Sequence, residues 1–298
     1  MTVDKRKYLE PEMVARLNNM SLRARMVVEG YILGLHKSPY HGFSVEFAEH
    51  RAYGPGDEIR HIDWKLYGKT DRYYVKQFEE ETNLRTHLIL DTSRSMTYGS
   101  GKVSKLEYAG YLSAALTYLM LSQQDGVGLV LFDNRINKFI PPRSNPGHLN
   151  TILSQLDQIR YGTDTRIGPV LHEMAERIKK SGLVILISDL LDEPEKIMAG
   201  LKHFRHNKQE VVVFHILDRQ ELEFNFSSRT RFRDLETTET ITTEPWQIQE
   251  RYAELVGRFQ DYYRRHCREQ KVDYIPFYTD QNLDLALNGY LQKRQRLG

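Results

Sequence analysis

The sequence predicts a three-layer α/β fold of the Rossmann type, in which helices cover both faces of a mostly parallel β-sheet, together with a small β-rich subdomain. After residue 83, short apolar runs typical of buried strands alternate with longer helical patterns, and such alternation favours a parallel sheet. The segment before residue 83 instead shows the turn-rich pattern of short antiparallel strands. A chain of 298 residues can bury a large core.

Two regions follow from these patterns. Residues 1–82 form an N-terminal helix and a β-rich segment, and residues 83–298 form the α/β domain, with a hairpin insertion at about 224–245. The expected strands of the α/β domain are 86–90, 127–132, 183–188, 211–217 and 272–278, with a short edge strand at 138–140. The expected helices are 105–123, 146–158, 167–179, 194–206, 246–270 and 283–293.

The N-terminal region contains a basic amphipathic stretch, "MVARLNNMSLRARMVVEGYILGL", which we expect to be a helix docked on the protein rather than on a membrane. Turn signals interrupt the strand-like segment 41–81 that follows it. Since an isolated hairpin is marginal in water, we expect segments 41–81 and 224–245 to pair or pack into one small subdomain.

Three segments carry small oxygen-bearing side chains at the ends of predicted strands. Asp91, Ser93 and Ser95 follow the first strand of the α/β region in the spacing D-x-S-x-S, and Asp189 ends the strand 183–188. The loop "RYGTDTRIG" adds Thr163 or Thr165. Ligands bind at the carboxyl ends of strands in such sheets, so we expect these groups to converge there, with Asp91 outside the core.

An oxygen-only donor set favours a hard divalent cation. Mg²⁺ prefers six oxygen ligands and keeps several waters, while Mn²⁺ and Ca²⁺ accept similar donors. A turn capped by Asp91 and the two serines is the simpler explanation of the first segment alone. The strand-terminal Asp189 and the threonine loop, in the right order along the chain, favour the metal site.

These motifs resemble known ones. "DTSRSM", "YGTDT" and "LISDLLDE" resemble the metal-ion-dependent adhesion site of von Willebrand factor A domains. "YGPGDEIRHIDWKLYGKTDRYYVKQFEEE" resembles the signature of a bacterial family of unknown function whose members accompany MoxR-type AAA+ ATPases. The resemblance spans roughly residues 40–285. By position, it implies that the metal ligands are Asp91, Ser93, Ser95, Thr163 and Asp189.

The function that the resemblance implies is binding without turnover. In such domains the ion bridges to an acidic side chain of a partner protein, so the chain is expected to be a Mg²⁺-dependent interaction module, an adaptor or chaperone partner of a MoxR-type ATPase. Candidate partner-binding residues are Asp57, Arg60, Asp63, Trp64 and Thr165, although Trp64 also fits a core position.

Composition and charge exclude other classes. The net charge of +2 gives no case for nucleic acid, and the longest apolar runs, 182–188 and 211–217, are too short to span a membrane. A single cysteine, Cys267, suits a reducing cytoplasm.

The alternative from a different class is a metal-dependent hydrolase or phosphatase using Asp91, Asp164 and Asp189. A phosphotransferase of the haloacid dehalogenase type is disfavoured, because the position of its acid/base aspartate is Ser93. We therefore expect no enzymatic activity.

Overall fold

The structure is a computed structural model that describes residues 20, 24–25, 27–28, 50–52, 67–68, 70, 73–76, 84–145, 147–162, 166–235, 239–283 and 287. Internal contacts divide the chain into two units, residues 35–83 and residues 1–34 with 84–298. Each unit is described by itself.

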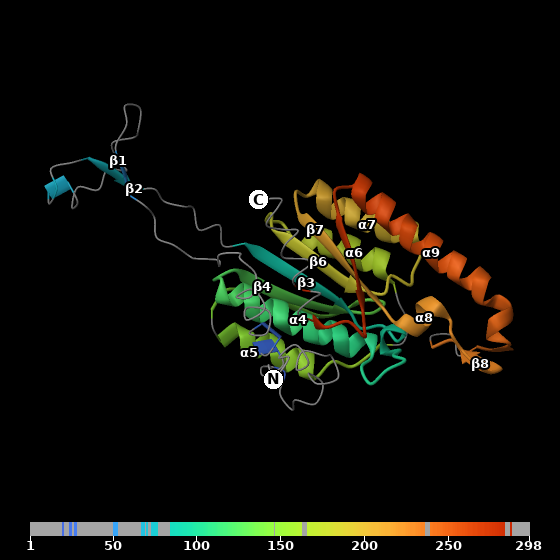
Figure 1. Cartoon of the computed structure of the whole chain (residues 1–298). Coiled ribbons are helices and arrows are strands. Elements are labelled where there is room, and N and C mark those ends of the chain that lie inside the picture. Colours follow the sequence, from blue (N-terminus) through green and yellow to red (C-terminus); the bar gives the residue numbers. More distant parts are fainter. Residues whose placement is uncertain are drawn as a thin grey trace, which may run out of the picture. The chain divides into compact units, whose positions relative to one another are not determined.

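A six-stranded sheet forms the centre of the larger unit (Figure 1). Its strands are β3 (Arg85–Asp91), β4 (Gly126–Phe132), β5 (Ile136–Arg143), β6 (Leu183–Ser188), β7 (Glu210–Leu217) and β10 (Asp273–Tyr278). Their spatial order is β10-β7-β6-β3-β4-β5, with every neighbouring pair parallel except β4 and β5. Counted in chain order, this is the doubly wound order 3-2-1-4-5-6. The predicted α/β fold with a mostly parallel sheet is confirmed.

Helices cover both faces of this sheet (Figure 1). The longer ones are α4 (Lys105–Ser122), α5 (Gly147–Asp157), α6 (Ile167–Arg177), α7 (Pro194–His206) and α9 (Pro245–Glu269). Alternate residues of β3 point to opposite faces: Leu88 and Leu90 pack with α4 and α5, whereas Ile89 packs with α6, α7 and α9. Two separate hydrophobic cores therefore hold the three layers together.

Four helical residues of the N-terminal stretch complete the first core. They are Met20, Ala24, Val27 and Val28, all buried in the cluster that contains α4 and α5. Their spacing of four, seven and eight residues from Met20 is that of one helix face. These residues agree with the predicted docking of the amphipathic stretch on the protein.

The predicted insertion forms a hairpin. Strands β8 (Thr230–Arg233) and β9 (Thr240–Thr243) pair antiparallel, and the Phe232 ring stacks on Phe224 with 5.0 Å between ring centroids. A short helix, α8 (Arg219–Glu223), precedes the hairpin and is capped by Asp218, whose carboxylate accepts a hydrogen bond from the Gln220 N–H. Helix α8 was not expected, because five residues are too few to show a helical period.

The smaller unit contains β1 (His50–Ala52) and β2 (Tyr74–Lys76), which pair antiparallel as the sequence predicts. Between them, Tyr67, Gly68 and Thr70 are helical, a departure from the all-strand expectation. Among the described strands β1 pairs with β2 and β8 with β9, so these strands form two separate two-stranded sheets. That the two segments pack into one subdomain stays a prediction. No helix in the described ranges has both the length and the apolar character needed to cross a bilayer.

Candidate metal site

Asp91 is the last residue of β3 and is fully buried. Its Oδ1 accepts a hydrogen bond from the Ser93 N–H (2.9 Å), and its Oδ2 accepts one from the Ser188 hydroxyl (2.6 Å). The expectation that Asp91 lies outside the core is therefore wrong. The segment after β3 and the last residue of β6 both contact this carboxylate.

Burial and, to a smaller extent, the neighbouring Asp189 carboxylate together raise the pKa of Asp91 to about 7. The hydrogen bonds from Ser188 and Ser93 act in the opposite direction but do not compensate. A cation that binds next to this buried carboxylate would stabilise its ionised form.

Two hydroxyl groups lie beside this carboxylate. Ser93 is fully buried and Ser95 is 9% exposed, at the start of the 3₁₀ turn η3 (Ser95–Thr97). Their Oγ atoms are 3.0 Å apart. Two oxygens at right angles on a Mg²⁺ ion, each at about 2.1 Å, are about 3.0 Å apart. The spacing of the hydroxyls therefore fits two adjacent ligands of such an ion.

Asp189 follows β6 and is paired with a lysine that the sequence analysis did not single out. The Lys105 Nζ donates to Asp189 Oδ2 (2.9 Å) and to Glu221 Oε1 (2.9 Å), and the Lys105 side chain is only 1% exposed. Lys105 is the first residue of α4, where the helix dipole disfavours a cation. A lysine in that position of a mostly apolar helix is the one sequence signal that could have identified it.

The positive charge of Lys105 is maintained by its two carboxylate partners. Burial alone would lower the pKa of Lys105, but the Asp189 and Glu221 carboxylates outweigh it and raise the pKa above its ordinary value. Burial raises the pKa of Glu221, against the effect of Lys105. Lys105 therefore stays protonated and forms ion pairs with both Asp189 and Glu221, whereas Asp91 makes no ion pair with any described residue.

The end of β6 is fixed by neighbouring strands. The His215 Nε2 hydrogen-bonds to the Asp189 carbonyl oxygen (2.9 Å), and the His215 Nδ1 lies 2.5 Å from the Tyr274 hydroxyl. Burial lowers the pKa of His215 to about 4, so the ring is neutral. The next residue, Leu190, has a positive φ of 59°, and its N–H donates to the Ser188 hydroxyl. These contacts fix the backbone that carries Asp189.

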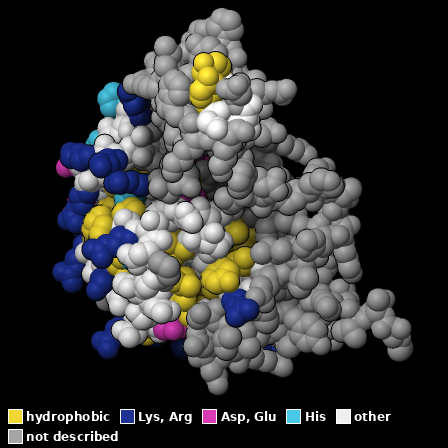
Figure 2. Space-filling model, turned by 90° about the vertical axis from the view of Figure 1, so that its left-hand side faces the viewer, with side chains coloured by type: hydrophobic (Ala, Val, Ile, Leu, Met, Phe, Trp, Pro, Cys, Tyr) yellow, Lys and Arg dark blue, Asp and Glu magenta, His cyan; other side chains and the backbone are white. Residues whose placement is uncertain are grey.

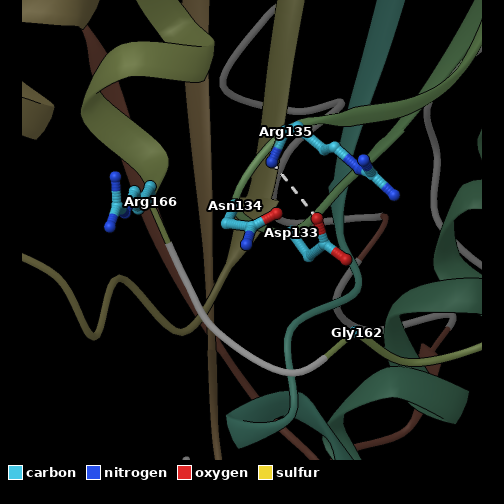
Figure 3. Close-up of a pocket in the computed structure, with 5 residues that line it drawn as sticks. All are labelled: Asp133, Asn134, Arg135, Gly162 and Arg166. Atoms are coloured by element: carbon cyan, nitrogen blue, oxygen red, sulfur yellow. Dashed lines mark hydrogen bonds between the residues drawn. The ribbon is translucent and has the colours of Figure 1, made fainter.

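An open hollow of about 650 Å³ lies beside the site (Figure 3). It is lined by Asp133, Asn134, Arg135, Gly162 and Arg166. Figure 3 shows Asp133 between Arg135 and the loop at Gly162, and the Gly162 N–H donates to the Thr92 carbonyl, at the end of β3 (2.8 Å). A Cβ on Gly162 would lie 2.0 Å from Asp133 Oδ2, so only glycine allows this approach.

The structure brings Asp91, Ser93, Ser95 and Asp189 to one edge of the sheet, as predicted from the sequence. Ser188 links the two strand ends, since it donates to Asp91 and directly precedes Asp189. The other predicted site residues, Thr163, Thr165, Asp164, Asp57, Arg60, Asp63 and Trp64, lie outside the described residues. Within the described part of the chain no three His, Cys, Asp or Glu side chains are grouped to hold a metal. A metal ion bound by the described residues of this edge would therefore need hydroxyl ligands as well as carboxylates.

Comparison with known proteins identifies a family and a fold. Residues 49–262 match the family described as "Protein of unknown function DUF58". The uncharacterized proteins Rv1480 of Mycobacterium tuberculosis and Mb1516 of Mycobacterium bovis are each 25% identical over 72% of this chain and 68% of their own length.

A crystal structure of an aerotolerance-related membrane protein from Bacteroides fragilis superposes with a TM-score of 0.50 at 19% identity, covering 72% of this chain and 99% of that one. At that identity the likeness is one of fold. The shared fold is the α/β architecture expected from the sequence, a mostly parallel sheet with helices on both faces.

Proposed function

This chain belongs to the DUF58 family, and we propose that it is a protein-interaction module that binds its partner through a Mg²⁺ ion at the carboxyl edge of the sheet. Asp91, Ser93 and Ser95 would hold the ion, with Asp189 beside them. The ion supplies positive charge to which a carboxylate of the partner can bind.

The pair of hydroxyls beside a buried carboxylate is the observation that carries this proposal. Ser93 and Ser95 have their Oγ atoms 3.0 Å apart, and Asp91 has a pKa raised to about 7 because it is buried without a cation partner. A turn that only capped the strand would gain nothing from burying that carboxylate, since burial of a charge costs free energy. A divalent cation would offset this cost.

The charge balance favours an acidic partner. Asp189 and Glu221 share the cation Lys105, so Asp91 is the carboxylate of the site without an ion pair to a described residue. A divalent ion there keeps residual positive charge, and the exposed residues Arg135 and Arg166 of the adjacent hollow add to it. An aspartate or glutamate of the partner is the ligand that such a site selects.

Exposed apolar side chains flank the same edge. Tyr161 is 63% exposed next to Gly162, and Leu191 is 50% exposed two residues after Asp189. Interfaces commonly surround a charged anchor with aromatic and aliphatic contacts. We therefore expect the partner segment to carry an acidic residue with apolar neighbours.

The proposed partner is a MoxR-type AAA+ ATPase or its client, with this chain as adaptor or chaperone partner in the cytoplasm. The resemblance of the N-terminal signature supports the partner, and the single, buried Cys267 is compatible with the compartment.

The test is the affinity of the purified chain for the purified MoxR-type ATPase of the same organism, with Mg²⁺ and with EDTA. We expect binding only with Mg²⁺, and Ser93→Ala with Ser95→Ala should weaken it as strongly as chelation does. Ser154→Ala with Ser181→Ala, at exposed serines away from the site, is the matched control. Undiminished binding by the Ser93 and Ser95 variant would eliminate the metal-bridged mode.

Two other experimental outcomes would favour a different function or binding site. Loss of binding in Asp57→Ala with Asp63→Ala, but not in the serine variant, would assign the partner to the N-terminal signature. Mg²⁺-dependent hydrolysis of a phosphate ester by the wild type but not by Asp91→Ala would favour the hydrolase.

A further inference from the structure

The opposite, amino edge of the sheet presents a row of exposed cations. Strands β3, β6, β7 and β10 are parallel and begin at this edge, and the antiparallel β5 ends there. In strand order, the row consists of Lys271 before β10, Lys208 before β7, Lys179 and Lys180 before β6, Arg85 at the start of β3 and Arg143 at the end of β5. At about 4.8 Å between strands, this amino-edge row extends over about 24 Å. Figure 2, which faces the left-hand side of Figure 1, shows Lys and Arg side chains gathered on one flank.

The row is not neutralised within the described part of the molecule. None of its six residues forms an ion pair there, whereas Arg177, Arg251 and Arg258 on the helices are paired with glutamates. Three carboxylates lie among the described residues at these strand starts, against six cations. Glu210 is exposed, Asp273 is half-buried, and Asp125 is half-buried and accepts a hydrogen bond from the Leu84 N–H. The edge is therefore electropositive.

Two members of the row occupy strained backbone positions. Lys208 and Lys271 have φ values of 59° and 55°, and each directly follows the C-cap of a helix, α7 or α9. Glycine is the usual residue there, because a side chain is disfavoured in the left-handed region. Attraction of a cation to the carboxyl end of the helix offsets part of this cost. Glycine at either position would relieve the backbone strain, but the positive charge would be lost.

The composition of the row indicates the kind of surface it binds. Four of its six members are lysines, which act as flexible point charges without the bidentate geometry of arginine. Among the described residues, no large exposed hydrophobic side chain lies at the strand ends that carry the row. The row therefore offers no aromatic side chains on which nucleic-acid bases could stack. A row of flexible point charges suits an extended anionic surface.

We propose that the amino-edge row adsorbs this protein to bilayers that contain anionic phospholipids. Because the row and the metal site lie at opposite edges of one sheet, a chain adsorbed in this way presents its metal site away from the bilayer. The inference is independent of the proposed function, since it uses none of the residues of the metal site.

The test is co-sedimentation of the full chain with vesicles of phosphatidylcholine alone or with one-third phosphatidylglycerol. We expect binding to the anionic vesicles only, and loss of binding at high salt. Lys208→Gly with Lys271→Gly removes two charges and relieves the strained backbone. This variant should lower the partition coefficient about tenfold or more, while its melting temperature stays equal or rises.

Two matched controls separate charge from backbone effects. Gln124→Gly changes a residue at the same edge with a φ of 63° and no charge, and Arg251→Gln with Arg258→Gln removes two charges from α9. Both should bind as the wild type does. The proposal is overturned by absence of vesicle binding at low salt, by undiminished binding of the glycine variant, or by equal losses in the controls. Tighter binding of a single-stranded oligonucleotide than of the vesicles, through the same residues, would assign the row to nucleic acid instead.

Discussion

The two edges of the sheet are built from the same strands and carry opposite chemistry. At the carboxyl edge, Asp91 and Asp189 are buried, and the cation Lys105 is buried between two carboxylates. At the amino edge, the cations are exposed and without ion pairs to described residues. Strand polarity produces this separation, because residues that follow parallel strands gather at one edge and residues that precede them gather at the other.

The two edges also differ in how their charges affect stability. Buried charges pay a large desolvation cost and need fixed partners, whereas exposed charges cost little and act through long-range attraction. Single substitutions should therefore have large effects on stability at the carboxyl edge and small ones at the amino edge.

The largest expected difference in the free energy of unfolding is between variants that each lack one lysine, at one edge or the other. Lys105→Met leaves the Asp189 and Glu221 carboxylates without their cation, so the free energy of unfolding should fall by about 3 to 5 kcal/mol. Lys179→Met, at the exposed edge, should change it by less than about 0.5 kcal/mol. Urea unfolding of both variants measures the contrast, and similar losses in the two would contradict it.

The next effect is a dependence of stability on pH at the carboxyl edge. The pKa of Asp91 is raised from 3.8 to about 7 in the folded state, chiefly by burial. The folded state therefore holds the proton more tightly, and this contribution to stability is complete below the unfolded pKa and lost as pH rises to about 7. In metal-free protein the loss should be on the order of 4 kcal/mol, from about 3.2 pKa units at about 1.4 kcal/mol each.

The measurement is the difference between wild type and Asp91→Asn in urea unfolding from acid to neutral pH. His87 and His215, whose pKa values burial lowers to about 4, act in the opposite direction in both proteins and cancel in this difference. If the difference in unfolding free energy between the two proteins did not change with pH, burial would not raise the pKa of Asp91 in the folded state.

Close packing beside the metal site gives a smaller effect. Gly162→Ala places a methyl group against the Asp133 carboxylate, so the free energy of unfolding should fall by about 1 to 3 kcal/mol. Gly101→Ala, where no atom lies within 4 Å of the added group, is the control. Thermal denaturation compares the two, and equal melting temperatures would mean that the loop at Gly162 does not approach Asp133.

The smallest effect is expected at the amino edge. Gln124 has a φ of 63°, so Gln124→Gly relieves a strained backbone and should raise the free energy of unfolding by about 0.5 kcal/mol. The same urea titration resolves this gain when it is compared with Gln123→Gly at the neighbouring C-cap position. A loss of stability in Gln124→Gly would show that the positive φ is not strained.

Sequence patterns predicted the strands, and that Asp91 and Asp189 lie at one edge of the sheet, for a simple reason. Apolar runs identify buried strands, and a parallel sheet places whatever follows them at one edge, so Asp91 and Asp189 could be assigned together. Lys105 could not be found in this way, because its partners Asp189 and Glu221 are 84 and 116 residues away. The burial of Asp91 was missed because it depends on loops, and the amino-edge row emerges only when the cations are ordered by strand.

The most direct test of the central claim is a calorimetric titration of the metal-free chain with Mg²⁺ and with Mn²⁺. We predict one bound ion per wild-type chain and no detectable binding by Asp91→Asn, because the buried carboxylate is the charged group available to the ion. Asp157→Asn, at an exposed aspartate on α5, should bind as the wild type does. Equal affinity of wild type and Asp91→Asn, or no binding by the wild type, would contradict the account.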